Sequence, residues 1–196
     1  EIVISSFTRS FFEEEETAWV ASARAGNVVG GGDWSEFRLI PDCVRSLRDE
    51  VPIKLRSPQA TRPWQFVLEP LAGYLLLGKR LVEEGKVFQG AWNFGPPVDN
   101  TKTVEHGAQA TVEAWGDGTI ERLPTAPFHE SMLLQLDSTK ARRYLGWRSV
   151  VDFSETMQLT TDWYKHQHTT GDASMRKYSM SQLDAFEELL NREVSL

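Results

Sequence analysis

An arginine and an asparagine have the side chains and settings to bind an anionic ligand. Arg62 stands beside Pro63 and Trp64 at the start of a segment expected to be ordered, which would fix the direction of its guanidinium group. A planar guanidinium can meet two phosphate oxygens at once, so Arg62 is a candidate for an anion contact, with a surface arginine that has no partner as the alternative. Asn27 follows a run expected to form a buried strand. Its amide could donate to a phosphate or sugar oxygen, or Asn27 could simply form a turn.

The glycine cluster at 24–34, RAGNVVGGGDW, has the composition of a phosphate loop but not the spacing. In a P-loop the second glycine of G-x-x-x-x-G is followed by lysine and a hydroxyl residue, whereas Gly26 and Gly31 are followed by Gly32 and Asp33. A dinucleotide fingerprint needs G-x-G-x-x-G, and no G-x-G pair of the chain reaches a third glycine at that distance. The cluster is therefore expected to be a flexible connection after a buried strand.

Metal binding and thiol chemistry find little support in the sequence. His166 and His168 have the H-x-H spacing of a metal site, but no cysteine or third histidine stands next to them. Cys43, the one cysteine, lies in the apolar run IPDCVRSL and is expected to be a buried structural thiol. A single cysteine cannot form an intramolecular disulfide, which favours a reducing, cytoplasmic location.

The composition is that of a soluble globular protein. Of the 196 residues, 40% are hydrophobic and 25% are charged, and the formal net charge is −7. An acidic surface disfavours nucleic acid and anionic lipid as partners, although a cleft can gather its own arginines around an anionic small ligand. No apolar run approaches the ~20 residues of a membrane span, and no signal peptide is visible. The first residue is not Met, so we expect a fragment of a longer protein.

The elements that would position these residues alternate between strands and helices. Apolar residues at helical spacing, with glycine or proline at the ends, predict helices, and short apolar runs predict buried strands. This alternation predicts an α/β fold. The expected helices lie at 1–12, 39–49, 68–84, 103–115, 138–145, 152–166 and 181–191. The expected strands lie at 18–25, 53–55 and 91–94, with short strands on either side of the turn region 123–127.

A series of short segments resembles, in order, the later half of the extended short-chain dehydrogenase/reductase enzymes that act on nucleotide sugars. The resemblance runs from Glu1 to about Tyr164. Within this NAD-dependent epimerase/dehydratase family, the cluster at 24–34 and the segments LIPDCVRSL and TRPWQFVLEPLAGYLLL are most similar to dehydratases of CDP-hexoses. The segments are Arg24-x-x-Asn27-Val28-x-Gly30, Arg38-Leu39-Ile40-Pro41, the run 61–67, Trp92-Asn93-Phe94-Gly95, the run 136–141, Leu145-Gly146-Trp147 and Thr161-Asp162-Trp163-Tyr164.

The resemblance implies the C-terminal part of an NAD(P)-binding Rossmann-like fold with a small mixed α/β substrate-binding lobe. Residues 1–35 would be the last part of the Rossmann domain. Residues 36–170 would be mainly the nucleotide-sugar lobe, interleaved with a returning Rossmann helix and strand at about 65–95. Residues 171–196 would form a C-terminal tail helix.

The resemblance also implies roles for individual residues. Arg62 would contact the diphosphate and Asn27 the nucleotide sugar, while the segment of Arg38 and Leu39 would close over the nucleotide. Arg24 and Asn27 are the candidates for a cofactor contact. The remaining expected substrate contacts have open alternatives: Lys54, with its neighbour Arg56, could be solvated charge, Asn93 could be a strand-end turn residue, and His129 could be an ordinary loop residue.

The complete enzyme, by resemblance, would be a hydro-lyase that turns CDP-glucose into CDP-4-dehydro-6-deoxyglucose for deoxysugar biosynthesis, such as that of O-antigen. It would oxidise the fourth carbon by hydride transfer to NAD, eliminate water across the fifth and sixth carbons, and return the hydride to the sixth. The family's Tyr-x-x-x-Lys pair and its NAD glycine turn do not occur in this sequence. We therefore expect no catalytic residue in the chain, NAD bound mainly by a preceding half, a homodimer only at full length, and an inactive fragment.

Two other functions remain open at this point. The chain could derive from another member of the same superfamily, such as an epimerase or a dTDP- or GDP-sugar dehydratase. It could also be a non-catalytic module that binds sugar nucleotides.

Overall fold

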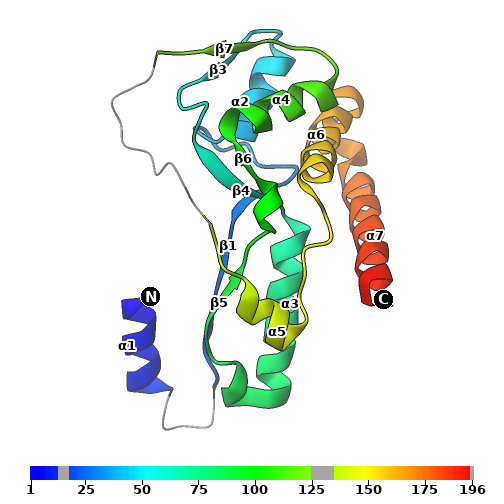
Figure 1. Ribbon diagram of the computed structural model, residues 1–196. Helices are drawn as coiled ribbons and strands as arrows, with labels where there is room; N and C mark the ends of the chain where they lie inside the picture. The colour runs from blue at the N-terminus through cyan, green and yellow to red at the C-terminus, as the bar shows by residue number, and fades with distance from the viewer. Residues whose placement is uncertain (13–17, 125–134, 195–196) are drawn as a thin grey trace.

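The computed structural model describes residues 1–12, 18–124 and 135–194, which form an upper and a lower lobe joined by a central sheet (Figure 1). Strands and helices alternate along the chain, which confirms the predicted α/β class. Helix α1 (Ile2–Phe11) stands beside the lower lobe and buries none of its residues. No helix in the described ranges is long and apolar enough to cross a membrane.

The lower lobe is built on two parallel strands, β1 (Ala21–Ala25) and β5 (Gly90–Phe94). Helices α3 (Leu68–Glu84) and α5 (Thr139–Leu145) pack against β5 and against each other. Because α3 carries apolar residues at helical spacing and ends at a glycine, its bounds agree with the prediction. The core of this lobe is rich in aromatic rings and consists of Leu77, Phe88, Trp92, Phe94, Ala141, Leu145 and Trp147.

A three-stranded sheet in the centre was not predicted. Strand β4 (Thr61–Phe66) lies between β2 (Asn27–Val29), to which it is parallel, and β6 (Thr101–Thr103), to which it is antiparallel. The prediction that the cluster at 24–34 is a flexible connection was therefore wrong for residues 27–29, which form β2. The ladder partner of β2 comes from a segment more than 30 residues away in the chain, and no local pattern announces that pairing.

Gly26 is the point at which the chain changes sheets. Before it, β1 pairs with β5, and after it, β2 pairs with β4. The amide of Gly26 donates instead to Oε1 of the buried Gln65, at 3.1 Å. A Cβ atom here would lie 2.6 Å from the carbonyl oxygen of Pro63, so the close approach of two backbones requires glycine.

The upper lobe contains α2 (Leu39–Arg48), α4 (Val104–Trp115) and α6 (Phe153–Thr170), with β3 (Ile53–Leu55) parallel to β7 (Ile120–Arg122). The helices have clear starts: Thr103 caps α4, and Asp152 forms a capping box at α6. Helix α2 buries one apolar face, including Cys43, which is fully enclosed as predicted. Burial raises the pKa of this thiol, which suits a structural role.

The tail helix α7 (Met175–Val194) begins before the predicted start at 181. It lies along α6 (Figure 1), and Phe186 packs with Phe66 and Val151 in a fourth core cluster. The first turns of α7 are mainly polar, with only the scattered Met175 and Met180, so the apolar pattern alone does not show where the helix begins. The remaining short elements are the 3-10 turns Gly85–Phe88, Val98–Asn100 and Asp172–Ser174.

Candidate functional site

A pocket of about 1300 Å³ opens between the upper lobe and the central sheet. Five of the residues predicted to bind substrate line it, from four different elements and one loop end: Asn27, Arg38, Leu39, Lys54 and Arg62. Sequence separation between the first and last of these is large, so only the fold brings them together.

Strand β4 holds Arg62 and Asn27 in a fixed relation. Asn27 is the register partner of Trp64, two residues beyond Arg62, on the neighbouring strand. On its other side Arg62 is paired with Lys102 of β6, and the indole of the buried Trp64 donates to the carbonyl oxygen of Lys102 at 3.1 Å. One guanidinium nitrogen of Arg62 donates to the carbonyl oxygen of Thr61 at 2.8 Å. The segment is thus as ordered as the sequence predicts.

A buried tyrosine on α6 holds the loop between β2 and α2 through hydrogen bonds to the loop backbone. The hydroxyl of Tyr164 donates to the carbonyl oxygen of Asp33 at 2.7 Å and lies 3.3 Å from that of Gly30. Burial, together with the nearby Asp33 carboxylate, raises the pKa of Tyr164 to about 12, so the hydroxyl stays a donor at neutral pH. A Cβ at Gly31 would overlap the indole of Trp163, so this loop packs directly on α6.

The side chain of Asp33 stabilises the same loop by accepting hydrogen bonds from residues that follow it. One carboxylate oxygen accepts from the amide of Ser35 at 3.0 Å, and the other accepts from the guanidinium of Arg38 at 2.8 Å. Burial by itself would raise the pKa of Asp33, but these hydrogen bonds and the Arg38 charge hold it below its ordinary value. Arg38 is thereby fixed at the pocket wall beside the first turn of α2.

Arg45 was not singled out by the sequence, and it anchors the same loop to α2. Its guanidinium donates to the carbonyl oxygens of Trp34 at 3.0 Å and Ser35 at 3.2 Å and is paired with Asp42. Arginine on the polar face of an amphipathic helix is ordinary, so its type and spacing gave no signal. Only the tertiary contact shows its role.

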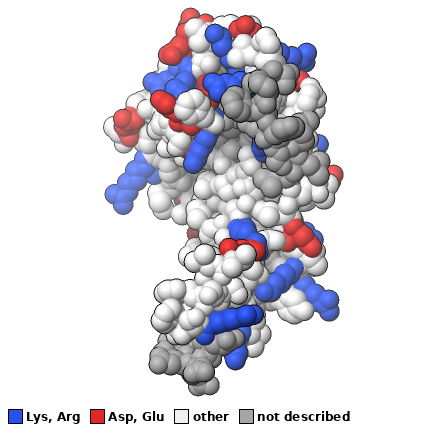
Figure 2. Space-filling model, turned by 90° about the vertical axis from the view of Figure 1, so that its left-hand side faces the viewer, with Lys and Arg blue, Asp and Glu red and all other residues white. Residues whose placement is uncertain are grey.

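The opposite wall of the pocket is formed by β3. Leu55 points into the core, while Lys54 is exposed and is the register partner of Glu121 on β7. Arg56 directly follows β3, and its guanidinium lies 5.8 Å from the centroid of the Phe37 ring. Five basic and four acidic side chains line the pocket, in a chain of net charge −7. Figure 2 shows this gathering of Lys and Arg beside acidic groups on the upper lobe. The pocket is therefore more positive than the protein around it.

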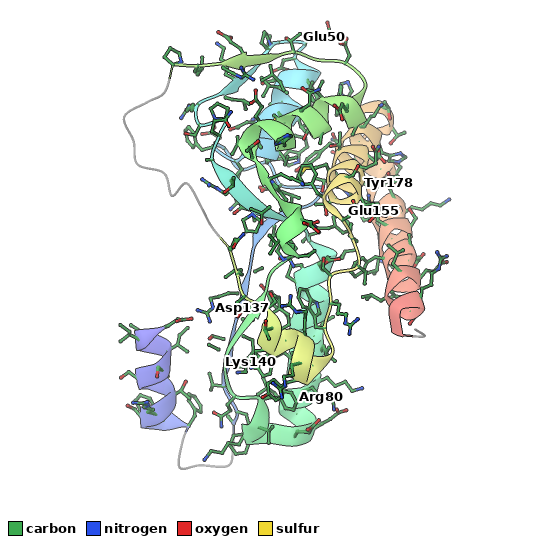
Figure 3. All side chains as sticks on the ribbon, in the orientation of Figure 1. Glu50, Arg80, Asp137, Lys140, Glu155 and Tyr178 are labelled. Atoms are coloured by element: carbon green, nitrogen blue, oxygen red, sulfur yellow. The ribbon has the colours of Figure 1, made fainter. Side chains whose placement is uncertain are left out.

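Asn93 and Arg24 do not line this pocket. They are register partners at the carboxyl ends of β5 and β1. The side-chain amide of Asn93 donates to the carbonyl oxygen of Asp137 at 3.0 Å, near the start of α5 (Figure 3), and Arg24 is paired with Glu1. In open parallel sheets, ligands bind outside the carboxyl ends of the strands, so these two residues mark a second polar site next to Gly26.

Three buried polar atoms at this second site have no hydrogen-bond partner among the described residues. They are Nε of Arg24, Oδ1 of Asn93 and Nε2 of Gln65. Gln65 is 1% exposed, and its other side-chain atom is already bonded to Gly26. Buried donors and acceptors without partners cost free energy, which a polar ligand can recover. The remaining predicted site residue, His129, lies outside the described residues. No group of His, Cys, Asp and Glu in the described ranges could hold a metal ion.

Comparison with known proteins agrees with this architecture. No family model matches the chain. Over 170 residues it is 43% identical to CDP-glucose 4,6-dehydratase of Salmonella typhimurium, an alignment that covers 84% of this chain and 47% of that protein. The chain thus spans about half the length of the curated relative that it matches.

Solved structures show the fold at lower identity. The dTDP-glucose 4,6-dehydratase of Bacillus anthracis, in complex with NAD, superposes with a TM-score of 0.67 at 17% identity, covering 86% of this chain and 50% of that one. The UDP-glucose 4-epimerase of Stenotrophomonas maltophila, which holds NAD and a formylated UDP-arabinopyranose, gives 0.70 at 16% identity, covering 86% and 54%. The predicted family resemblance and fold are confirmed. The chain is a homologue of CDP-glucose 4,6-dehydratase and has the fold of about half of an NAD-dependent epimerase/dehydratase of the extended short-chain dehydrogenase/reductase type.

Proposed function

We propose that the chain supplies the substrate-binding half of a CDP-glucose 4,6-dehydratase and that its pocket holds the CDP end of the substrate. The observation that carries the proposal is the convergence of Asn27, Arg38, Lys54 and Arg62 on one basic pocket in an acidic protein. The identity of 43% to an enzyme of that name supports the choice of substrate. In this proposal residues 36–170, apart from the returning elements at about 65–95, are the nucleotide-sugar lobe.

Each pocket residue would bind the part of the substrate that matches its side chain. Arg62, fixed on β4, would bind the diphosphate through its guanidinium fork, and Arg38 and Lys54 would add positive charge from the two walls. The amide of Asn27 would bind a phosphate or sugar oxygen. Held at one end in this way, the hexose would be directed along β2 towards the carboxyl ends of β1 and β5, which restricts the orientations it can take.

The second polar site fits a cofactor contact. The unsatisfied atoms of Arg24, Asn93 and Gln65 surround the segment at which the chain changes sheets. These groups lie at the carboxyl ends of parallel strands, where they could hydrogen-bond with polar atoms of NAD or with hydroxyl groups of the hexose. Bound NAD would supply a hydride acceptor for the fourth carbon of the sugar and return the hydride later. The residues of this chain would only orient that chemistry.

Calorimetric titration of the 196-residue chain with CDP, UDP, dTDP and GDP tests the proposal. We expect CDP to bind most tightly, and Arg62→Ala to weaken CDP binding by roughly tenfold or more, because a charge-assisted contact contributes about 1.5–3 kcal/mol. Arg80→Ala is the matched control, since Arg80 lies on α3, far from the pocket, and pairs with Glu84 at 2.5 Å (Figure 3).

The outcomes separate the three candidate functions. Preference for UDP, dTDP or GDP would favour another member of the superfamily. Tight CDP binding by a chain that never supports turnover with any complementing half would favour a non-catalytic binding module. Absence of nucleotide binding, or equal losses in the Arg62 and Arg80 variants, would contradict the proposal.

A further inference from the structure

Phe37 combines two features that are unfavourable for folding, a positive φ and an exposed ring, and burial offsets neither. Its backbone φ is 63°, in the left-handed region that favours glycine. Its side chain is 78% exposed, although the residue is large and apolar. It lies between the charged residues Glu36 and Arg38, in the loop that leads into α2. Strained, exposed residues of this kind concentrate at ligand-binding sites.

The conformation of Phe37 is imposed by fixed neighbours on both sides. Asp33 binds the amide of Ser35 and the guanidinium of Arg38, which closes the loop around Phe37. Arg45 holds the carbonyl oxygens of Trp34 and Ser35. Because the loop is over-determined, the ring is held at the pocket and does not collapse onto the core.

The ring lines the pocket opposite a guanidinium group. Arg56, at the end of β3, lies 5.8 Å from the ring centroid, within cation–π range. Both residues line the same pocket as Arg62 and Asn27. An aromatic ring and a guanidinium plane are the two surfaces on which nucleobases stack in proteins, and stacking needs no hydrogen-bond pattern.

We propose that Phe37 is the stacking surface for the nucleobase of the bound nucleotide, and that Arg56 sets the orientation of its ring. This inference rests on the proposed function, because it requires a nucleotide in the pocket. Phe37 thus makes the pocket prefer a ligand with a planar base over one that offers the diphosphate alone. The strain at φ 63° is retained because a relaxed loop would turn the ring away from the ligand.

The test compares Phe37→Gly, Phe37→Ala and Phe37→Trp with the wild type in CDP binding. Phe37→Ala and Phe37→Gly should weaken CDP binding about tenfold, the size of one base–aromatic stack, and Phe37→Trp should retain it. In the wild-type complex the H5 and H6 protons of cytosine should shift upfield in the NMR spectrum, and this shift should vanish in Phe37→Gly. The melting temperature of Phe37→Gly should equal or exceed that of the wild type, because glycine adopts positive φ without strain.

Glu50→Gly is the matched control. Glu50 is the other non-glycine residue with positive φ among the described residues, at 55°, and it lies at the outer end of the upper lobe and does not line the pocket (Figure 3). Its replacement should relax the same kind of strain and leave CDP binding unchanged. Wild-type CDP binding with no loss of affinity or of the cytosine shift in Phe37→Gly would overturn the inference and leave the proposed function standing. Absence of CDP binding by the wild type would overturn both.

Discussion

Glu69 shows at the scale of one residue how the fold constrains an ionisable group. It is 2% exposed on α3, and one of its carboxylate oxygens accepts from the amides of Val150 and Val151, at 2.7 and 2.8 Å. Its other oxygen has no partner among the described residues. Burial outweighs the hydrogen bonds from Val150 and Val151 and raises the pKa of Glu69 above its ordinary value of 4.5.

This raised pKa makes the stability of the protein depend on pH. The folded state binds the proton of Glu69 more tightly than the unfolded state does, so its stabilising effect is complete below pH 4.5 and is lost as pH rises through the folded pKa. Glu69→Gln keeps an acceptor for both amides and carries no charge. We expect the variant to become more stable than the wild type in urea unfolding as pH rises from 5 to 8. A constant difference across that range would contradict the assignment.

Single residues of the candidate site could be predicted from the sequence only in part. Arg62 and Asn27 stand out by type and setting, and the structure places both in one pocket with Lys54. Asn93 lies elsewhere, because its strand pairs with β1 and leads to the second polar site. Phe37 gave a weak signal, as an aromatic residue in a polar loop, but its positive φ depends on tertiary hydrogen bonds that no local pattern contains.

Among the elements, the helices and the short apolar strands β1, β3 and β5 were predictable, whereas β2, β4 and β6 were not. The apolar stripe and terminal glycine define α3 from the sequence alone. Strand β4 contains Pro63 and polar residues, which argue against a central strand. It nevertheless has a neighbour on each side, because its first half pairs only with β6 and its second half pairs only with β2. Pairing between distant segments decides such strands, and a single sequence does not display it.

The change of sheets at Gly26 gives a prediction about the backbone. Gly26→Ala would place a Cβ atom 2.6 Å from the carbonyl oxygen of Pro63, and we expect it to destabilise the protein by about 1–3 kcal/mol. Gly78→Ala is the matched control, because Gly78 lies inside α3 and a Cβ atom there would meet no other atom within 4 Å. It should stabilise the helix by about 0.5–1 kcal/mol. Thermal unfolding checks both signs, and a Gly26 variant as stable as the wild type would refute the close approach.

At the scale of the whole molecule, the lower lobe carries apolar side chains that the described residues do not cover. On α3, Leu75 and Val82 are 77% and 88% exposed, although the sequence places them in the apolar stripe of that helix. On α1, Ile2 and Phe7 are also exposed. The sheet beside them has only two strands in the described ranges. An apolar surface of this kind is typical of a contact with further protein.

This surface should bind a hydrophobic dye. We expect the isolated chain to enhance the fluorescence of anilinonaphthalene sulfonate while folded, and the double change Leu75→Glu and Val82→Glu to reduce that signal without lowering the melting temperature. A change to glutamate at the buried Leu77 should instead unfold the lobe, which distinguishes surface from core. A folded wild-type chain that binds no dye would show that this face is covered.

The proposed function depends above all on where the nucleotide binds. We would titrate the isotopically labelled chain with CDP and follow the backbone amide resonances by NMR. We expect the resonances of Arg80 and Glu188 to stay unmoved and the largest shifts to occur around the pocket of about 1300 Å³, at Asn27, Phe37, Arg38, Lys54 and Arg62. Shifts centred outside that pocket, or none at millimolar CDP, would contradict it.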